Sequence, residues 1–271
     1  MKEIEDFKYR DNGKDSLINQ RHFHNNCYEI LHITSGTGVM MIRDKLYPLQ
    51  SGSVFFINGT DAHCSIPEIP ENYIRSKIIF SRNLINNVLS HADCTLWAET
   101  LFNTNSGVCV DFTPEQSAKL DTLLLKLSEN LKVNTYDSKL KIILSILSIM
   151  NMAIESKARY IPPLKNKMSE LLEYINKNID KKLSLDELCS KLHISKYYLC
   201  RTFKKTMDMT IFEYILVTRL SKAKQMLSES DSTVSDIAMN CGFCSFAYFS
   251  KVFKEQENIS PLQYRKNTQI I

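Results

Sequence analysis

The sequence predicts an α+β fold in two domains, an N-terminal β-barrel followed by a helical segment and a C-terminal domain built only of helices. Its 271 residues are enough to bury two hydrophobic cores. Short runs typical of strands extend to about residue 80, and a helical periodicity replaces them further on. Pro162 and Pro163 indicate a boundary, because neither proline nor the residue before it continues a helix well. The expected parts are a barrel at 1–112, a helical segment at 113–157, a linker at 158–165 and a helical domain at 166–271.

The strands of the predicted barrel are short runs rich in Val, Ile, Tyr and Phe. Glycines and an Asn58-Gly59 turn signal separate them. Several such strands at close spacing indicate a small barrel or sandwich. The expected strands are Tyr28–Ile33, Val39–Ile42, Lys45–Leu49, Val54–Ile57 and Ile74–Phe80.

Two amphipathic helices follow the barrel. Between Pro114 and Leu131, and again between Ser138 and Ile154, apolar residues recur at spacings of three and four. These stripes either cover the barrel or form the interface of a homodimer, and the pattern leaves both interpretations open. The stripes consist of Leu120, Leu123, Leu124 and Leu127 in the first helix, and of Leu140, Ile143, Leu144, Leu147 and Met150 in the second.

Beyond Lys165 every segment has the pattern of a helix, and seven helices are expected in this domain. Small polar residues that favour N-caps stand before the apolar-periodic runs. The N-cap candidates are Ser184, Ser195, Ser232 or Thr233, and Ser260.

An internal repeat is the most informative feature of the C-terminal half. Residues 185–189 match residues 234–238 at an offset of 49, and residues 199–204 match residues 249–254 at an offset of 50. Each unit has a short helix, a tight turn and a longer helix, which is the layout of a helix-turn-helix. The motifs are expected at about 184–206 and 233–256, with a linking helix at about 210–228.

The turns of the two motifs differ in sequence. Gly242 supplies the second turn, where a positive φ angle is easily adopted. His193 takes the equivalent place in the first motif. We interpret His193 as a turn residue that tolerates positive φ, in preference to a ligand-binding histidine.

The longer helix of each motif keeps basic and aromatic side chains on its outer face. Leu199 and Phe203 in the first helix, like Phe249 and Phe253 in the second, stand four apart and face the core. Basic groups neutralise phosphates or bind guanine edges, and exposed apolar groups contact thymine methyls. The alternative is an ordinary solvated surface, which the repetition makes the weaker interpretation. The predicted DNA-binding residues are Lys196, Tyr197, Cys200, Arg201 and Lys204 in the first helix, and Ser245, Phe246, Ala247, Tyr248, Lys251 and Lys254 in the second.

Several longer motifs also occur in this half. They are residues 194–204, Ile237-Ala238 with Gly242-Phe243, residues 248–254, and the ending Ser260-Pro261-Leu262-Gln263-Tyr264-Arg265. Over about 100 residues the chain thereby resembles the AraC/XylS family of transcription regulators. The resemblance implies two recognition helices that enter successive major grooves on one side of the duplex, roughly 34 Å apart. It assigns base reading to Tyr197, Cys200 and Arg201, and to Phe246, Ala247, Tyr248 and Lys251.

Histidines are concentrated near the start of the predicted barrel. His22, His24 and Glu29 are followed by Gly36, and Gly52 is followed by His63. In this spacing, residues 22–63 resemble the cupin family, although Asn58 and Thr60 replace the usual proline and glycine. The resemblance implies three possible roles for the set, which are binding a divalent metal ion, hydrogen-bonding a sugar, or a structural role. The set consists of His22, His24, Glu29 and His63.

The interior of the cupin-like barrel is the expected effector pocket, since small barrels enclose one small molecule. The resemblance implies a sugar or related metabolite as the effector. The expected partners are double-stranded DNA, a second copy of the chain in a homodimer and, for an activator, RNA polymerase. No cofactor is expected, apart from the divalent metal ion that the histidine and glutamate set leaves open.

Two other functions stay open at this point. The first is a metal-dependent cupin enzyme with an appended DNA-binding domain, which depends only on the four possible ligands. The second is a regulator that responds to no small molecule. A Ser-His-Asp elbow, a Walker loop and a dinucleotide fingerprint are all missing from the sequence, so a non-enzyme is expected.

Charge and cysteine usage agree with a cytoplasmic DNA-binding protein. Residues 1–164 hold 17 Lys and Arg against 18 Asp and Glu, net −1, whereas residues 165–271 hold 17 against 12, net +5. The most apolar run, residues 142–154, is too short to cross a bilayer, and the N-terminus has no signal-peptide pattern. The eight cysteines are therefore expected to be free thiols, and Cys241 of the single C-x-x-C pair is expected to be a buried apolar residue.

Overall fold

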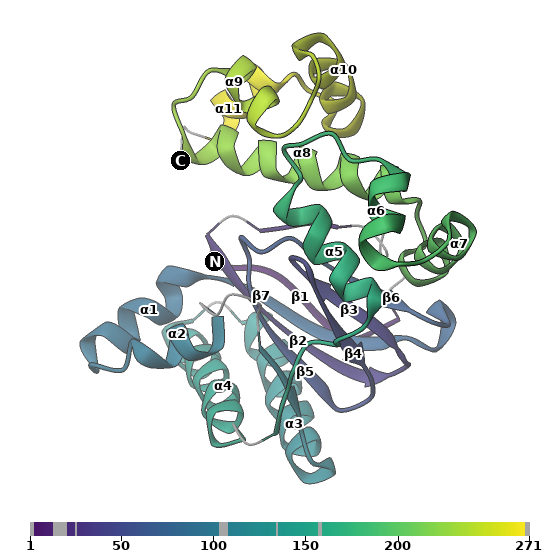
Figure 1. Ribbon diagram of the computed structural model, residues 1–271. Coiled ribbons are helices and arrows are strands. Elements are labelled where there is room, and N and C mark those ends of the chain that lie inside the picture. Colours follow the sequence, from purple (N-terminus) through teal and green to yellow (C-terminus); the bar gives the residue numbers. More distant parts are fainter. Residues whose placement is uncertain are drawn as a thin grey trace. The chain divides into compact units, whose positions relative to one another are not determined.

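The computed structural model describes residues 3–12, 21–24, 26–102, 108–133, 135–156 and 159–268. The chain forms two compact units, Met1–Leu164 and Lys165–Ile271 (Figure 1). The described strands all lie in the first unit, and the regular elements described in the second unit are all helices. The predicted two-domain α+β fold is confirmed.

Two antiparallel sheets make up the strand-rich part of the first unit. The larger sheet has the order β1-β7-β2-β5-β8-β9, and the smaller sheet has the order β4-β3-β6. All five predicted strands form. The strands are β1 (Ile4–Asp11), β2 (Cys27–Ser35), β3 (Gly38–Ile42), β4 (Lys45–Leu49), β5 (Ser53–Asn58), β6 (His63–Pro67), β7 (Ile74–Ser81), β8 (Val108–Asp111) and β9 (Tyr160–Ile161).

The prediction that these strands close into a barrel is wrong. Within the described residues the strands form two separate sheets, and the isolated bridge between His22 and His63 extends neither ladder. Prolines give a physical reason, because proline has no N–H to donate and is confined to the edges of sheets. Pro48 lies in β4 and Pro67 ends β6, the two outer strands of the smaller sheet. The first unit is therefore an open arrangement of two sheets.

Both faces of the larger sheet are apolar, which explains why β2 and β5 show no hydrophobic alternation. Between the sheets, Leu31 of β2 belongs to one core cluster with Met40 of β3 and Tyr47 of β4. On the opposite face, Ile30 and Phe80 share a second cluster with the helices (Figure 1). These helices are α1 (Arg82–His91), α2 (Leu96–Phe102), α3 (Pro114–Leu131) and α4 (Tyr136–Glu155), and a 3-10 turn, η1 (Pro70–Asn72), precedes β7.

The two helices of the predicted helical segment, α3 and α4, bury different kinds of stripe. Both begin with a capping box. α3 buries Leu120, Leu124 and Leu127, as predicted. α4 buries Met150, as predicted, together with a stripe of isoleucines, whereas the predicted stripe residues Leu140 and Leu144 are 56% and 53% exposed. Both stripes of α4 fit a helical period, so periodicity alone does not tell which one faces the sheet.

The second unit contains seven helices within its described part, as predicted. The side chains of Ser184, Ser195, Thr233 and Ser260 each accept a hydrogen bond from the backbone N–H three residues later. Thr233, and not Ser232, is therefore the cap of its helix. The helices are α5 (Lys167–Lys177), α6 (Leu185–Leu192), α7 (Lys196–Met207), α8 (Ile211–Glu229), α9 (Val234–Asn240), α10 (Phe246–Glu257) and α11 (Pro261–Thr268).

The turns of the two helix-turn-helix units both contain a residue with positive φ, but they differ in the space that they leave for a side chain. His193 has φ 54° and Gly242 has φ 84°. A Cβ atom added at position 242 would lie 2.4 Å from the carbonyl oxygen of Ile179. The second turn is therefore closed to any side chain, while the first already holds one.

Gly242→Ala is expected to lower the free energy of unfolding by on the order of 2 kcal/mol, because the new Cβ atom combines positive φ with a backbone clash. His193→Ala, the matched control at the equivalent turn, is expected to change it by less than about 0.5 kcal/mol. Urea unfolding followed by circular dichroism measures both values. Equal unfolding free energies for Gly242→Ala and the wild type would contradict the prediction.

Candidate functional site

The outer face of α7 carries all five residues predicted for the first recognition helix. α7 buries Leu199, Phe203 and Met207, and this orients the opposite face outward. A shallow groove of about 590 Å³ follows that face. It is lined by Lys196, Tyr197, Cys200, Arg201, Lys204 and also Lys205, which is not among the predicted residues although it directly follows Lys204.

The charges of α7 are of one sign. Its 12 residues hold four basic side chains and no acidic one. Lys196 Nζ lies 2.6 Å from Asp186 Oδ1 of α6, and this hydrogen bond raises the pKa of Lys196. Arg201 Nη1 lies 3.5 Å from the hydroxyl oxygen of Tyr197. This excess of basic side chains suits binding to phosphates.

The outer face of α10 is more apolar than that of α7. α10 buries Phe249, Val252 and Phe253, while Phe246 and Tyr248 are both 47% exposed. Its two lysines are balanced by two glutamates within the same 12 residues. All the residues predicted for the second recognition helix are exposed, namely Ser245, Phe246, Ala247, Tyr248, Lys251 and Lys254.

The long helix α8 connects the two motifs. Near its start, the ring of Tyr214 packs 5.6 Å from the ring of Phe203 in α7. Further along, Leu220 and Leu227 belong to the core cluster of the second motif with Phe249. At 1.5 Å per residue, its 19 residues span about 28 Å. The length of α8 thus sets the distance between the outer face of α7 and that of α10.

Four predicted residues of the first unit lie together. His22 bridges His63 at the start of β6, and Glu29 lies in β2. Together with His24 these residues form a set in which each side chain offers one atom to a metal ion, and these four atoms all lie within 4.8 Å of one another. Four such atoms around a transition metal ion lie roughly 3 to 4 Å apart, because each bond is about 2.1 Å long. Small side-chain shifts would therefore fit this set to an ion.

The carboxylate of Glu29 is the buried centre of this cluster. Its Oε2 lies 2.9 Å from His63 Nε2 and 3.3 Å from His24 Nε2. Burial raises the pKa of Glu29, but the charge and hydrogen bond of His63 and the nearby imidazole of His24 outweigh it and hold that pKa well below its ordinary value. The carboxylate is therefore ionised, which is the form that binds a metal ion or a hydroxyl group.

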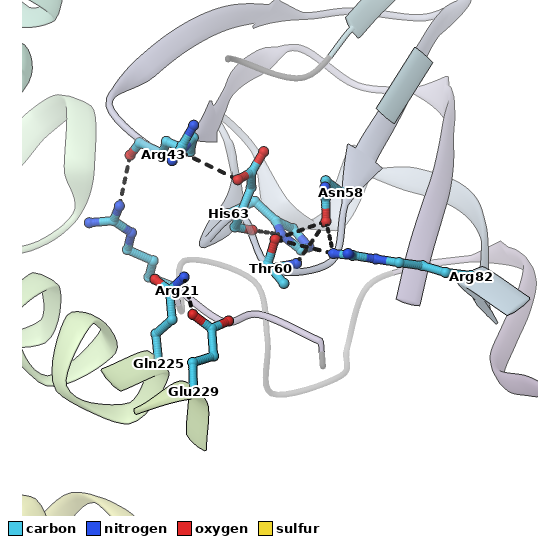
Figure 2. Close-up of polar contacts among 9 residues, drawn as sticks. Arg21, Arg43, Asn58, Thr60, His63, Arg82, Gln225 and Glu229 are labelled. Carbon is cyan, nitrogen blue, oxygen red and sulfur yellow. Dashed lines mark hydrogen bonds and ion pairs between the residues drawn. The ribbon is translucent and has the colours of Figure 1, made fainter. Parts of the chain in front are cut away.

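The loop that carries His63 is fixed by side-chain contacts (Figure 2). Asn58 Oδ1 accepts hydrogen bonds from the backbone N–H of Thr60 at 3.2 Å and from Arg82 Nη2. His63 Nδ1 lies 2.7 Å from the carbonyl oxygen of Asp61. Asn58 and Thr60, the two departures from the cupin pattern, thus hold this loop together with Arg82 and leave His63 Nε2 facing Glu29.

The cysteines provide no second cluster. All eight are free thiols in the structure, as predicted. Cys241 is fully buried, and burial raises the pKa of its thiol to about 11. Cys244 is exposed. The C-x-x-C pair therefore combines one inert core residue with one surface thiol.

Comparison with known families gives two matches that together cover most of the chain. The profile described as "Helix-turn-helix domain" matches residues 188–267, and the profile described as "AraC-like ligand binding domain" matches residues 8–131. The chain belongs to the AraC family. It is thus a transcription regulator of this family, with a ligand-binding unit ahead of a helix-turn-helix unit. In its described residues, no helix is long and apolar enough for a membrane span.

Two similar transcriptional activators align with nearly the whole chain, and a third protein aligns with about a third of it. The HTH-type transcriptional activator RhaR of Mannheimia succiniciproducens is 24% identical over 240 residues, which are 88% of this chain and 84% of that protein. The transcriptional activator RhaS of Klebsiella pneumoniae is 24% identical over 248 residues, 92% of this chain and 88% of that protein. The bifunctional transcriptional activator/DNA repair enzyme AdaA of Bacillus subtilis is 36% identical over 96 residues, 35% of this chain and 46% of that protein.

Two solved structures are also similar. ToxT from Vibrio cholerae aligns with 98% of this chain and 95% of its own, at 19% identity and a TM-score of 0.38. The DNA-binding domain of AdpA, solved in complex with a target DNA, aligns with 39% of this chain and 96% of its own, at 21% identity and a TM-score of 0.38.

Proposed function

We propose that this AraC-family regulator reads double-stranded DNA with α7 and α10 as its two recognition helices. The repetition carries the proposal, because each motif has a 12-residue helix that is capped by a serine, anchored by buried phenylalanine and exposed on its other face. The length of α8, about 28 Å, supports binding in successive major grooves, which lie roughly 34 Å apart.

Fluorescence anisotropy on the full chain tests this function. The probes are duplexes from upstream of its own gene and of the neighbouring genes, each at several salt concentrations. We expect tight binding to one fragment that weakens as salt rises, because phosphate contacts release counterions. Equal binding to all fragments at every salt concentration would overturn the proposal. A substrate screen for cupin-type enzyme activity would then follow.

We further propose that the first unit binds a small-molecule effector between its two sheets, of the class of sugars and related metabolites. The apolar residues and the histidine and glutamate cluster on this inner side support the proposal. We assign the protein no catalytic activity and a cytoplasmic location, where it reaches DNA. If it is an activator, as the names of the RhaR and RhaS relatives suggest, RNA polymerase is a further partner.

We also propose a homodimer that pairs through α4. Tyr136, Leu140 and Leu144 stand four residues apart on one face and are 93%, 56% and 53% exposed. An apolar strip over several turns of one helix suits a two-fold contact, in which the same strip of a second copy covers it. The strip lies beside the buried stripe of α4, so the partner would contact a helix that is already held against the sheet.

Replacing both Leu140 and Leu144 by glutamate is expected to convert the dimer into a monomer, because the pairing would bury unpaired charges. Sedimentation equilibrium of the full chain measures the mass. Leu125→Glu, an exposed leucine of α3, is the matched control and should leave the dimer unchanged. A wild-type monomer, or a double variant that stays dimeric, would refute the proposed interface.

A divalent metal ion in the histidine and glutamate cluster is our second candidate function. The observation that favours it is the convergence of three imidazoles and one carboxylate within 4.8 Å. Such a donor set suits a first-row transition metal, which would orient the effector or polarise it. In this case His22, His24, Glu29 and His63 would be its ligands.

Elemental analysis after expression in metal-supplemented medium tests the ion. We expect about one transition metal ion per chain in the wild type and at least a 10-fold lower content in His63→Ala, because a direct ligand is lost. His91→Ala, a change of the same kind on the surface helix α1, is the control. Protein free of transition metal after such expression would rule out this candidate.

A further inference from the structure

Two basic side chains are buried on the inner face of the larger sheet. Arg75 and Lys77 of β7 are each only 4% exposed. In the ladder with β2, Arg75 stands opposite Ile33 and Lys77 opposite Leu31. Residues directly opposite each other in an antiparallel pair share a face. Because Ile33 and Leu31 belong to the cluster between the sheets, Arg75 and Lys77 lie on that inner side too.

The two basic groups differ in how they are paired. Lys77 Nζ lies 2.8 Å from Asp6 Oδ2 of β1, so its charge has a partner. Arg75 Nε and Nη2 are both buried, and neither has a hydrogen-bond partner in the part of the chain that the structure describes. The other described arginines with a buried unpaired nitrogen have one such atom each. Two missing hydrogen bonds on one buried guanidinium cost folding free energy. A ligand that accepts both hydrogen bonds would remove this cost.

Three described acids lie near the two basic groups, and Asp11 of β1 stands opposite Arg75 in the ladder with β7. Asp6 pairs with Lys77, and Glu29 is held by His63 at 2.9 Å and by His24 at 3.3 Å. The guanidinium carbon of Arg75 lies 5.6 Å from the centre of the Tyr73 ring, and burial raises the pKa of the Tyr73 hydroxyl. No acid in the described residues, Asp11 included, accepts a hydrogen bond from these two nitrogens.

The two unpaired nitrogens of Arg75 indicate which chemical group of a ligand would bind there. The N–H groups on Nε and Nη2 lie on the same edge of the planar guanidinium and point in parallel, and that edge binds both oxygens of one carboxylate. Beside it, the Tyr73 hydroxyl donates to Ser65 Oγ at 2.9 Å, across to the smaller sheet. The cluster between the sheets, which contains Ile33 opposite Arg75, adds apolar side chains, as in ligand sites where a few polar groups fix the orientation of the ligand.

We propose that Arg75 binds a carboxylate of the effector, so that the molecule that switches this regulator is a small organic acid and not a neutral sugar. The inference rests on the proposed effector-binding role of the first unit and names the chemical class of its ligand. Lys77, two residues away on the same strand face, already pairs with Asp6, so Arg75 is the group that would bind the acid. The apolar residues between the sheets would contact the rest of the acid.

The test uses pairs of probes that differ only at the carboxylate. The pairs are galacturonate with galactose, glucuronate with glucose, hexanoate with hexanamide, and benzoate with benzamide. Each is added at millimolar concentration to the full-length wild type and to the variants Arg75→Met and Arg75→Lys. Arg10→Met, at an exposed arginine of the neighbouring strand β1, is the matched control. Thermal unfolding and titration calorimetry provide the readouts.

We expect at least one acid to raise the melting temperature of the wild type and of Arg10→Met while its neutral counterpart does not. Arg75→Met should lose this response. Arg75→Lys should bind the same acid about 10- to 100-fold more weakly, because lysine keeps the charge but not the paired N–H groups. Without any probe, Arg75→Met should melt no lower than the wild type, because an unpaired buried charge is removed.

Three results would overturn the assignment. These are an equal response of the wild type to acids and their neutral counterparts, a full response in Arg75→Met, and no response of the wild type to any acid in the set. Duplex binding is measured on the same samples without probes. If Arg75→Met keeps the wild-type preference for one duplex, failure of the acid test leaves the DNA-reading function intact. An acid response without any duplex preference would overturn only the DNA-reading function.

Discussion

Arg201→Ala is expected to weaken binding to the preferred duplex by about 10- to 100-fold, the loss typical of one arginine that contacts a base edge. Arg201 is exposed on the outer face of α7, and its guanidinium donates a long hydrogen bond to the Tyr197 hydroxyl, at 3.5 Å. Removing it should therefore leave the melting temperature of the protein unchanged. Fluorescence anisotropy with the preferred duplex and with a scrambled duplex measures the loss and its specificity.

Lys177→Ala is the control for this variant, because Lys177 is an exposed basic residue of α5 that pairs with Glu173 outside either recognition helix. It should bind both duplexes like the wild type. An equal loss of Arg201→Ala on the preferred and the scrambled duplex would reduce Arg201 to a phosphate contact. No loss on either duplex would remove α7 from the interface.

The two recognition helices are expected to contribute different kinds of energy. α7 has four basic residues and no acid, whereas α10 has two lysines and two glutamates. Each phosphate contact adds about 0.9 to the slope of log affinity against log salt concentration, so most of the salt dependence should come from α7. α10, with exposed Phe246 and Tyr248, is better suited to contacts with thymine methyls and to sequence-dependent shape.

The helical half was predictable from sequence because its signals are local. The spacing of Leu199 and Phe203 fixes the buried face of α7, and capping serines fix where the helices begin. The repeat doubled each of these signals, so even the αL turn at His193 was predicted. The closeness of His22, His24, Glu29 and His63 followed from a resemblance and not from any local rule.

The features that the sequence did not predict depend on contacts between segments that are distant in the chain. Closure of the barrel depends on which strand edges pair, and short strands do not encode that. The exposure of Leu140 and Leu144 depends on which of two apolar stripes faces the sheet. Arg75 and Lys77 alternate with apolar or small residues in β7, a pattern that normally indicates a solvent-facing side. Their burial becomes visible only when the second sheet is placed over them.

Phe249→Ala is expected to lower the free energy of unfolding by about 3 to 5 kcal/mol, the usual cost of deleting a core phenylalanine. Phe249 is fully buried, with its ring 4.9 Å from Phe243 and 5.5 Å from Phe253. Since this cluster holds α10 against α8 and α9, DNA binding should be lost together with stability. Urea unfolding and anisotropy on the same preparation measure both effects.

Phe246→Ala supplies the matched comparison, because the same substitution is made three residues earlier on the exposed face of the same helix. Its unfolding free energy should stay within about 0.5 kcal/mol of wild type. Its affinity for the preferred duplex should fall by about 10-fold, as expected for the loss of one thymine-methyl contact. If Phe246→Ala bound DNA like the wild type while Phe249→Ala lost both properties, α10 would act as a structural support of the motif and not as a reader of bases.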